Sequence, residues 1–258
     1  MKAYAAALTL SARRSLENKQ DLAVRVLFYV IVLGVLSALW RVALHAAGGR
    51  IGGYDYSSIL WYLAASEAAV IATKPRLIEE TGDDISNGSV AVEMLRPVSV
   101  AGFRMAQEAG ESISLYFVSL VIGAPLVWIN AGAPPALEGV LLMLPSAVLA
   151  IVCNVAAQHV FAAAAFWLDD AKATWFLYQK LVFLVGGMLL PLEMFPEWLN
   201  VVSWILPFWT MAYAPARFLS GHSDPLLLLA QGGWAVALVA GALAIFSLGE
   251  KRIQVAGG

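Results

Sequence analysis

Residues 139–168 read GVLLMLPSAVLAIVCNVAAQHVFAAAAFWL and contain no aspartate, glutamate, lysine or arginine. A run of ~20 predominantly apolar residues is enough for an α-helix to cross the hydrocarbon core of a bilayer. If it is helical throughout, this longer run measures ~45 Å at ~1.5 Å per residue, so we expect it to tilt, to kink at Pro145 or to project into the cytoplasm. The run therefore predicts a membrane-spanning helix.

The composition of the whole chain leads to the same class. Of its 258 residues, 60% are hydrophobic and 13% are charged, with 16 lysines and arginines against 18 aspartates and glutamates. Soluble domains average about 45–50% apolar and about 25% charged residues. The composition thus excludes a soluble globular domain, a disordered chain and a nucleic-acid-binding protein with a basic surface. The single cysteine, Cys153, excludes an intrachain disulfide and a thiolate metal cluster.

Six apolar runs have the length and composition of membrane spans, namely 22–44, 54–73, 109–129, 139–168, 174–190 and 226–248. We therefore expect an all-α polytopic membrane protein with one transmembrane domain over residues 1–258 and both termini on one side. With the loops assigned alternately, thirteen of the 16 basic residues fall on that side and three, Arg41, Arg50 and Arg217, on the other. Because cytoplasmic loops are enriched in lysine and arginine, both termini are expected in the cytoplasm.

Residues 1–21 precede the first expected span. Their apolar side chains recur every four positions, at Tyr4, Leu8, Ala12 and Leu16, which is typical of an amphipathic helix. Such a helix is expected to lie in the cytoplasmic interface of the membrane. The alternative is a cleaved signal peptide, which is less favoured because Arg13 and Arg14 stand where a small-residue cleavage site would be.

The expected cytoplasmic connection 74–108 is long and rich in acidic residues, with apolar residues spaced among them. The acids are Glu79, Glu80, Asp83, Asp84, Glu93 and Glu108, and the apolar residues are Leu77, Ile78, Ile85, Val90, Val92, Met94 and Leu95. A solvated loop does not need such apolar residues, whereas a surface that docks a protein does. The alternative is an amphipathic helix on the lipid headgroups, which fits less well because the cytoplasmic leaflet is anionic.

Residues 191–224 form the expected outer connection, which is apolar and aromatic but broken by Pro196, Pro207 and Pro215. Proline in a helix interior removes a hydrogen bond, so one spanning helix is excluded and two short helices split near Pro207 are expected. We interpret them as a re-entrant hairpin that roofs a pathway, with a gate of aromatic residues: Phe195, Trp198, Trp204, Phe208 and Trp209. The alternative is a pair of interfacial helices that only anchor the protein.

Ionisable residues within expected spans are functional candidates because burying them is costly, and Glu67 and Lys180 are the instructive pair. Glu67 and Lys180 each lie six residues, or ~9 Å, from the cytoplasmic end of their own run. An ion pair between them would lower the cost of both. The alternative is that Lys180 extends to the headgroups while Glu67 is partly hydrated.

Three polar residues, Asn154, Gln158 and His159, fall in the run 139–168. They are candidates for lining a polar pathway, although hydrogen bonding between helices is the more common role of such residues. No catalytic residue is predicted, because His159 has no evident serine or cysteine partner. No metal site is predicted either, since the three histidines form no paired motif. An integral membrane enzyme acting on a lipid is nevertheless kept as the alternative class.

This arrangement resembles the ABC-2 type transporter permeases. The shared features are an interfacial N-terminal helix, six spans, a long loop after the second span and an apolar re-entrant pair before the last span. Residues 78–85, IEETGDDI, followed by Gly88 and by Leu95-Arg96-Pro97-Val98, are similar to the coupling segment of that family, in which Ile, Gly, Leu and Leu-Arg/Lys-Pro recur. The chain is most similar to the small permeases of about 260 residues that are encoded beside a second permease and an ATPase.

The resemblance implies a subunit of an exporter in the bacterial cytoplasmic (inner) membrane, not an enzyme in its own right. Two permease subunits, expected to be related but distinct chains, would join two ATP-binding subunits that carry ATP and Mg²⁺. This chain has no GxxxxGK[ST] motif and is expected to bind no cofactor itself. The expected coupling residues are Glu79, Glu80, Asp83, Asp84, Ile85, Gly88, Leu95, Arg96 and Pro97, with the acids facing basic groups of the ATPase and Ile85 and Leu95 as apolar contacts. The expected cargo is hydrophobic or amphipathic: a drug, a lipid or a peptide.

Overall fold

The computed structural model describes residues 2–74, 76–168 and 172–256, which fold into helices and turns without a β-sheet. Residue 1 of the expected interfacial helix and residue 75 of the expected cytoplasmic loop lie outside these ranges. The helices are α1 (Lys2–Glu17), α2 (Lys19–Ala46), α3 (Tyr56–Ala72), α4 (Leu77–Ser86), α5 (Ser89–Glu93), α6 (Val100–Ala131), α7 (Leu137–Ala162), α8 (Lys172–Val185), α9 (Glu197–Ile205), α10 (Tyr213–Leu219) and α11 (Pro225–Ala256). Three short 3₁₀ helices, η1 (Ala163–Phe166), η2 (Leu192–Met194) and η3 (Pro207–Thr210), join them. The all-helical prediction is confirmed.

Four helical stretches are long and apolar enough to cross a membrane: α2, α6, α7 with η1, and α11. The other two expected spans are shorter in the structure, because α3 has 17 residues and α8 has 14. The run 174–190 does not remain helical to its end. Helix α8 stops at Val185, since Gly187 adopts a positive φ of 68° and Pro191 follows.

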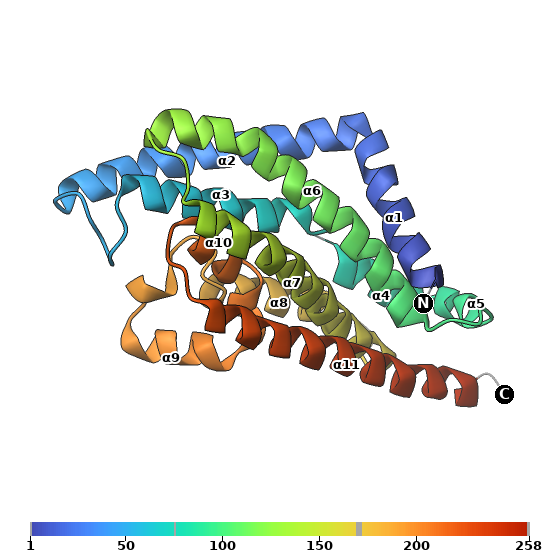
Figure 1. The fold of residues 1–258 in the computed structure, drawn as a ribbon. Coiled ribbons are helices and arrows are strands. Elements are labelled where there is room, and N and C mark those ends of the chain that lie inside the picture. Colours follow the sequence, from blue (N-terminus) through green and yellow to red (C-terminus); the bar gives the residue numbers. More distant parts are fainter. Residues whose placement is uncertain (1, 75, 169–171, 257–258) are drawn as a thin grey trace.

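Different elements lie at the two ends of the molecule (Figure 1). The start of α1, the end of α11 and the α4–α5 segment lie together at one end, here called the terminal end. The connection between α2 and α3, together with α9, lies at the opposite end, here called the far end. The start of α1 and the end of α11 therefore lie at the same end of the molecule.

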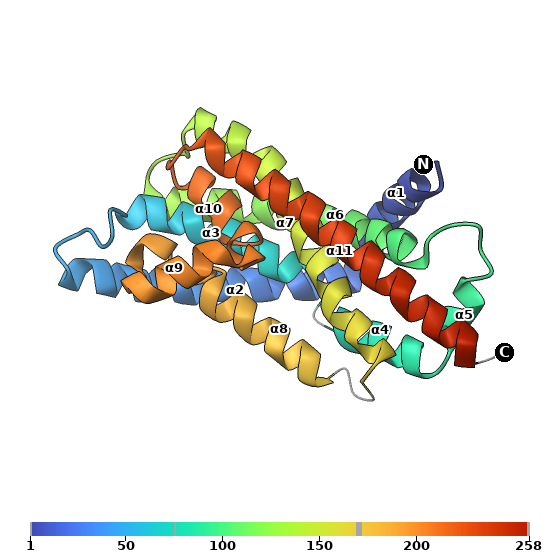
Figure 2. The same cartoon turned by 90° about the horizontal axis from the view of Figure 1, so that it is seen from below.

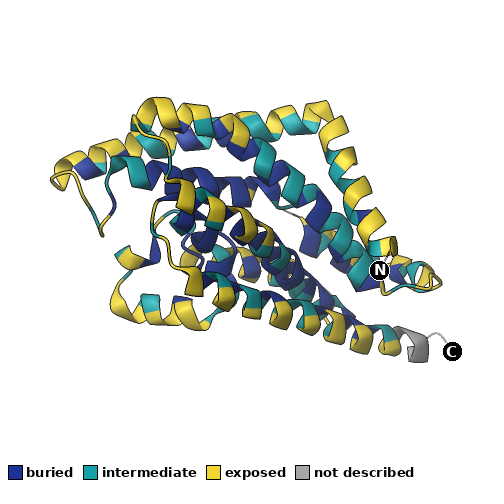
Figure 3. Cartoon of the chain, viewed as in Figure 1, coloured by how far each residue is buried: buried dark blue, intermediate teal, exposed yellow. Residues whose placement is uncertain are grey.

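Helix α3 is enclosed by its neighbours, and 13 of its 17 residues are buried (Figure 3). It packs against α2, α6 and α10. Helix α2 differs, because it buries only four of its 28 residues and leaves one apolar row open. That row consists of Val24, Leu27, Phe28, Ile31, Val35, Leu39 and Val42. Large exposed apolar surfaces are typical of contact with lipid or with another chain.

The expected N-terminal helix is present as α1, and it is docked on the first half of α6. The backbone amide of Ser99 donates to the hydroxyl of Tyr4 at 3.2 Å, and Ser114 Oγ donates to the carbonyl of Ala12 at 3.3 Å. Between these contacts the helices touch backbone to backbone, because a methyl group at Gly110 would overlap the carbonyl oxygen of Leu8. The absent side chain of Gly110 sets how closely α1 approaches.

We predict that Gly110→Val destabilises the protein by ~1–3 kcal/mol, because the neighbour that the new side chain meets is backbone and cannot move aside. Gly34→Ala is the matched control, since the position is also helical but has open space around it, and there we expect a change of less than ~1 kcal/mol in the stabilising direction. Thermal unfolding of the purified variants in detergent measures both. Equal unfolding temperatures for the two variants would show that α1 does not depend on this contact.

Candidate functional site

Helix α4 is amphipathic, and its apolar side is buried against α7, α8 and η1. Leu77, Ile78 and Ile85 face inward with Thr81 and Gly82, which follows from the helical period of 3.6 residues. Ile85 was expected as an apolar contact for a partner, but it is only 7% exposed and belongs to the core. That expectation is corrected, because the same periodicity that exposes the acids of α4 turns Ile85 away from solvent.

The acids of α4 are mostly paired within the chain. Glu79 meets Arg76 at 2.7 Å, Glu80 meets Lys74 at 2.7 Å, and Asp84 meets Arg104 at 2.8 Å. Asp83 is exposed, and so is Glu80 despite its ion pair. Of these acids, Glu80 and Asp84 connect α4 with neighbouring elements.

Helix α5 turns outward after Gly88, whose φ of 79° permits the reversal between α4 and α5. Val90 is buried beneath the turn, whereas Val92 and Leu95 are 69% and 84% exposed. Arg96 and Pro97 are exposed beside Leu95. The expected contact residues Leu95, Arg96 and Pro97 thus lie on one accessible segment, together with Val92 from the apolar residues of the same loop.

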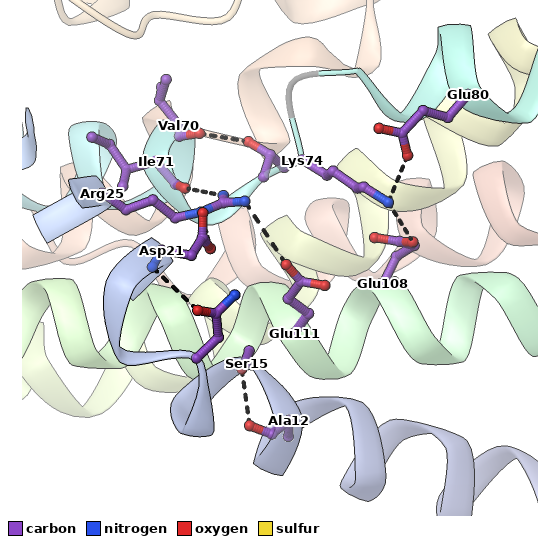
Figure 4. Close-up of polar contacts among 12 residues, drawn as sticks. Ala12, Ser15, Asp21, Arg25, Val70, Ile71, Lys74, Glu80, Glu108 and Glu111 are labelled. Carbon is purple, nitrogen blue, oxygen red and sulfur yellow. Dashed lines mark hydrogen bonds and ion pairs between the residues drawn. The ribbon is translucent and has the colours of Figure 1, made fainter. Parts of the chain in front are cut away.

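Lys74 and Arg104 join the α4–α5 segment to the long helices, and Arg25 joins α2 to α3 and α6 beside them. Figure 4 shows the contacts of Lys74 and Arg25. Lys74 bridges Glu80 and Glu108, at 2.7 and 3.7 Å. Arg25 pairs with Asp21 at 2.8 Å and Glu111 at 3.9 Å and donates to the carbonyl of Ile71 at 3.3 Å. Arg104 binds Glu93 in a bidentate pair at 2.9 Å and also binds Asp84. We call the residues joined in this way the terminal ion-pair cluster: Asp21, Arg25, Lys74, Glu80, Asp84, Glu93, Arg104, Glu108 and Glu111.

A cavity of about 290 Å³ lies between the end of α3, the middle of α7 and the length of α8. Asn154 and Gln158 line it from α7, and Tyr178 and Lys180 line it from α8. Asn154 Oδ1 accepts hydrogen bonds from Gln158 Nε2 at 2.5 Å and from the Tyr178 hydroxyl at 3.0 Å. Figure 2 shows α8 at the edge of the bundle, where it forms one wall of this cavity.

His159 does not line the cavity with the other two expected pathway residues. It is fully buried, its Nδ1 lies 2.8 Å from the carbonyl of Val155, and its ring lies 5.8 Å from that of Phe246 in α11. Gln158 and His159 face different sides of α7, because neighbouring positions in a helix point ~100° apart. The structure thus groups Asn154 and Gln158 with the cavity and places His159 in the packing between α7 and α11.

The structure does not bring Glu67 and Lys180 together. Glu67 is buried in α3, and within the described ranges its Oε1 has no hydrogen-bond partner. Lys180 is exposed at the cavity wall, with its Nζ 5.0 Å from the ring centre of Phe176. The α3 residues lining that cavity are Ala69, Val70, Thr73 and the neighbouring Lys74, so Glu67 does not face it. The two residues were expected to pair because they have equal depth in their helices, but their side chains do not face each other.

The five aromatic residues expected at an outer gate divide between surface and interior. Trp198 and Trp204 are 69% and 39% exposed, whereas Phe208 and Trp209 are buried and Phe195 packs against the core. The ring of Trp204 lies 5.0 Å from that of Trp209 and 5.8 Å from that of Tyr213. The expected pair of short helices is present as α9 and α10, with the break at Pro207.

A polar cluster behind these rings was not predicted from the sequence. Glu193 accepts hydrogen bonds from the hydroxyls of Tyr213 at 2.7 Å and Tyr54 at 3.3 Å, and it pairs with Arg217 at 2.9 Å. We call these four residues the Glu193 cluster. It joins the start of α3 to η2 and α10, so residues separated by more than 130 positions meet at the far end.

Gln231 of α11 is a second unpredicted polar contact. It is fully buried, its Nε2 donates to the carbonyls of Thr210 at 2.8 Å and Ser146 at 3.0 Å, and its Oε1 accepts from Ser146 Oγ at 2.8 Å. Such bonds between helices are a common use of glutamine within a membrane. Among the residues that the structure describes, no group of three His, Cys, Asp or Glu is placed to hold a metal ion.

Comparison with known families gives one match. The sequence model of the ABC-2 family transporter proteins matches residues 22–257, which is nearly the whole chain apart from α1. No curated protein matches this sequence significantly.

The bidentate pair predicts a pH-dependent loss of stability. Hydrogen bonds from Arg104 lower the pKa of the Glu93 carboxyl below its ordinary value. Such a carboxylate stabilises the fold above its unfolded-state pKa of ~4.3, and the contribution is lost as the pH falls through the lower, folded-state value. We expect Arg104→Gln to cost ~1–3 kcal/mol at neutral pH and less in acid. Unfolding at a series of pH values measures this, with Arg76→Gln as the exposed control that changes little.

The Glu193 cluster predicts a different sensitivity at the far end. Glu193→Gln keeps the shape of the side chain but removes the charge that Arg217 pairs with, so we expect a loss of ~1–2 kcal/mol. Glu197→Gln, at the exposed start of α9, is the matched control with an expected change within ~0.5 kcal/mol. Unfolding in detergent compares the two, and equal losses would contradict a structural role for the cluster.

Proposed function

Because the chain belongs to the ABC-2 transporter family, we propose that it is the membrane permease subunit of an ATP-driven exporter. Its role is to carry a hydrophobic or amphipathic substrate outward, with energy supplied by a separate ATP-binding subunit. ATP and Mg²⁺ bind that partner, since this sequence has no GxxxxGK[ST] motif.

The exposed apolar segment at the terminal end is the observation that supports this proposal most directly. Val92 and Leu95 stand out from α5 and the turn after it, beside the exposed Arg96 and Pro97 and one helix away from the exposed Asp83. An apolar patch rimmed by charged residues is typical of a protein-protein contact. The ATP-binding subunit docks on this patch in our proposal, with Leu95 as its central apolar contact.

The terminal ion-pair cluster then explains how movement at the patch reaches the membrane. Arg104 binds both Asp84 of α4 and Glu93 of α5 and is itself part of α6. Lys74, which follows α3, bridges α4 and α6. A displacement of α4 and α5 by the ATPase is therefore carried to α3 and α6 through charged pairs that are partly shielded from water, where electrostatic interactions are stronger than at an exposed surface.

The distribution of basic residues supports placing the terminal end in the cytoplasm. In the proposed topology all six expected segments cross the bilayer, with the short α3 sheltered by its neighbours, and α9 and α10 form the outer re-entrant pair. A second permease subunit, a related but distinct chain, and two ATP-binding subunits complete the proposed complex in the bacterial cytoplasmic membrane. The open apolar row of α2 faces lipid or that second subunit.

We predict that Leu95→Asp reduces recovery of the co-expressed ATP-binding subunit by about tenfold or more, because a carboxylate would be buried in the contact. Leu95→Met is the matched control and should recover the partner as the wild type does. Leu95 is 84% exposed, so neither change should alter the fold of this chain. Co-purification and ATP hydrolysis by the complex are the two measurements.

The proposal fails if the wild-type chain recovers no ATP-binding subunit from a host expressing the neighbouring genes. If both proteins associate and Leu95→Asp has no effect, the docking surface is misplaced while the transport function stands. Co-purification of the ATP-binding subunit with the wild-type chain distinguishes the two outcomes.

A further inference from the structure

Building on the proposed transport function, we propose that the cavity between α3, α7 and α8 is a binding site for an amphiphile with an anionic head group and an apolar body, and that Lys180 sets its charge preference. The cavity, which has a volume of about 290 Å³, is large enough to take part of such a molecule. The substrate class follows from what lines it.

The walls of the cavity are mostly apolar and adaptable. Trp175, Val182 and Phe183 line it from α8, and Met188 and Met211 line it where the chain turns after α8 and η3. Aromatic side chains offer large apolar surfaces, and methionine fills irregular space and tolerates ligands of different shape. These residues suit a hydrocarbon or aromatic body and exclude a strongly hydrated polymer from this part of the chain.

The charges at the wall have one sign. The described residues that line the cavity include two lysines and no aspartate or glutamate. Lys74 is already bound to Glu80 and Glu108 in the terminal ion-pair cluster. For Lys180, within the described part of the chain, no carboxylate oxygen lies within 4.0 Å of Nζ, and its neighbour is the ring of Phe176. Among the described residues at the wall, Lys180 is therefore the cation that no carboxylate compensates at this distance, and its charge faces the cavity.

A lysine within an apolar helix is costly unless an anion or water compensates it. Lys180 lies eight residues after the start of α8, which is ~12 Å along the helix axis. A carboxylate or phosphate bound there gains a charge-assisted hydrogen bond and relieves that cost, whereas a neutral or cationic head group does not. The amides of Asn154 and Gln158 add polar atoms on the opposite wall.

The test measures binding to the purified chain alone, in neutral detergent at pH 8. The probes are a dansyl-labelled undecanoic acid and its methyl ester, which share the same apolar body and differ in head group, a carboxylate in one and a neutral ester in the other. Fluorescence titration gives the affinity of each. We expect the acid to bind about tenfold more tightly than the ester, as for a hydrogen bond to a charged group. Lys180→Met should abolish this difference and leave the ester affinity unchanged, which also shows that the variant is folded.

Two further variants and one control complete the design. Lys180→Arg should retain the preference for the acid, and Phe183→Ala should weaken both probes alike, because it removes apolar wall without changing charge. Lys19→Met, at the exposed start of α2, removes a lysine that does not line the cavity and should leave both affinities unchanged. Equal binding of the acid and the ester by the wild type, or an unchanged preference in Lys180→Met, overturns the inference.

Membrane lipid and transported cargo can both supply such an anion. Adding phosphatidylglycerol or phosphatidylcholine to the titration separates them: displacement of the acid by the anionic lipid alone identifies a lipid ligand, and no displacement by either identifies a free amphiphile. Both outcomes support the anionic chemistry, and equal displacement by the two lipids opposes it. The titration contains no ATPase, so equal binding of the two probes would contradict this binding site and leave the proposed function as it stands. Failure to co-purify the ATP-binding subunit would contradict the proposed function and leave the binding site as it stands.

Discussion

The enclosure of α3 is the constraint on which the rest of the structure depends. Five alanines, Ala64, Ala65, Ala68, Ala69 and Ala72, are buried within its last three turns, and small residues let neighbouring helices approach closely. Helices α2, α6 and α10 use this access. In a bilayer there is no hydrophobic force between helices, so close packing and hydrogen bonds must hold them. A larger residue in this row would separate three helices at once.

The two ends of α3 are held by different chemistry, which fits their proposed roles. At the terminal end, long flexible cations bridge several carboxylates, so a pair can change partners as the elements move. At the far end, the carboxylate of Glu193 accepts hydrogen bonds from two tyrosine hydroxyls and pairs with an arginine. The hydroxyl of Tyr62 donates to the carbonyl of Gly187. The first arrangement accommodates displacement, and the second holds the outer elements in one geometry. A pathway that opens outward would have to break the second arrangement.

Features of the fold that depend on local sequence could be predicted, and features that depend on packing between distant segments could not. Both ends of α2 and the starts of α7 and α11 were predicted within three residues, because apolar runs of that length leave few alternatives, whereas α11 continues eight residues beyond its expected end. The end of α8 was missed, because glycine and proline outweighed hydropathy after Val185. Ile85 was assigned to the docking surface because it lies in the cytoplasmic connection, and Glu67 was paired with Lys180 because the two have equal depth in their spans. Neither criterion gives the side of the helix that a residue occupies, which is decided by packing. The Glu193 cluster joins residues far apart in the chain, so no local pattern indicated it.

The contact between α1 and α6 has a consequence for how the protein is made. Leu8 and Gly110 meet backbone to backbone, although about a hundred positions separate them. Helix α1 is synthesised before α2 to α5, yet its docking surface on α6 is synthesised only after them. Until then its apolar side, with Tyr4 and Leu8, has the membrane surface as its available partner. Completion of the N-terminal region therefore waits for the middle of the chain, and contacts so distant in sequence are the slow ones to form.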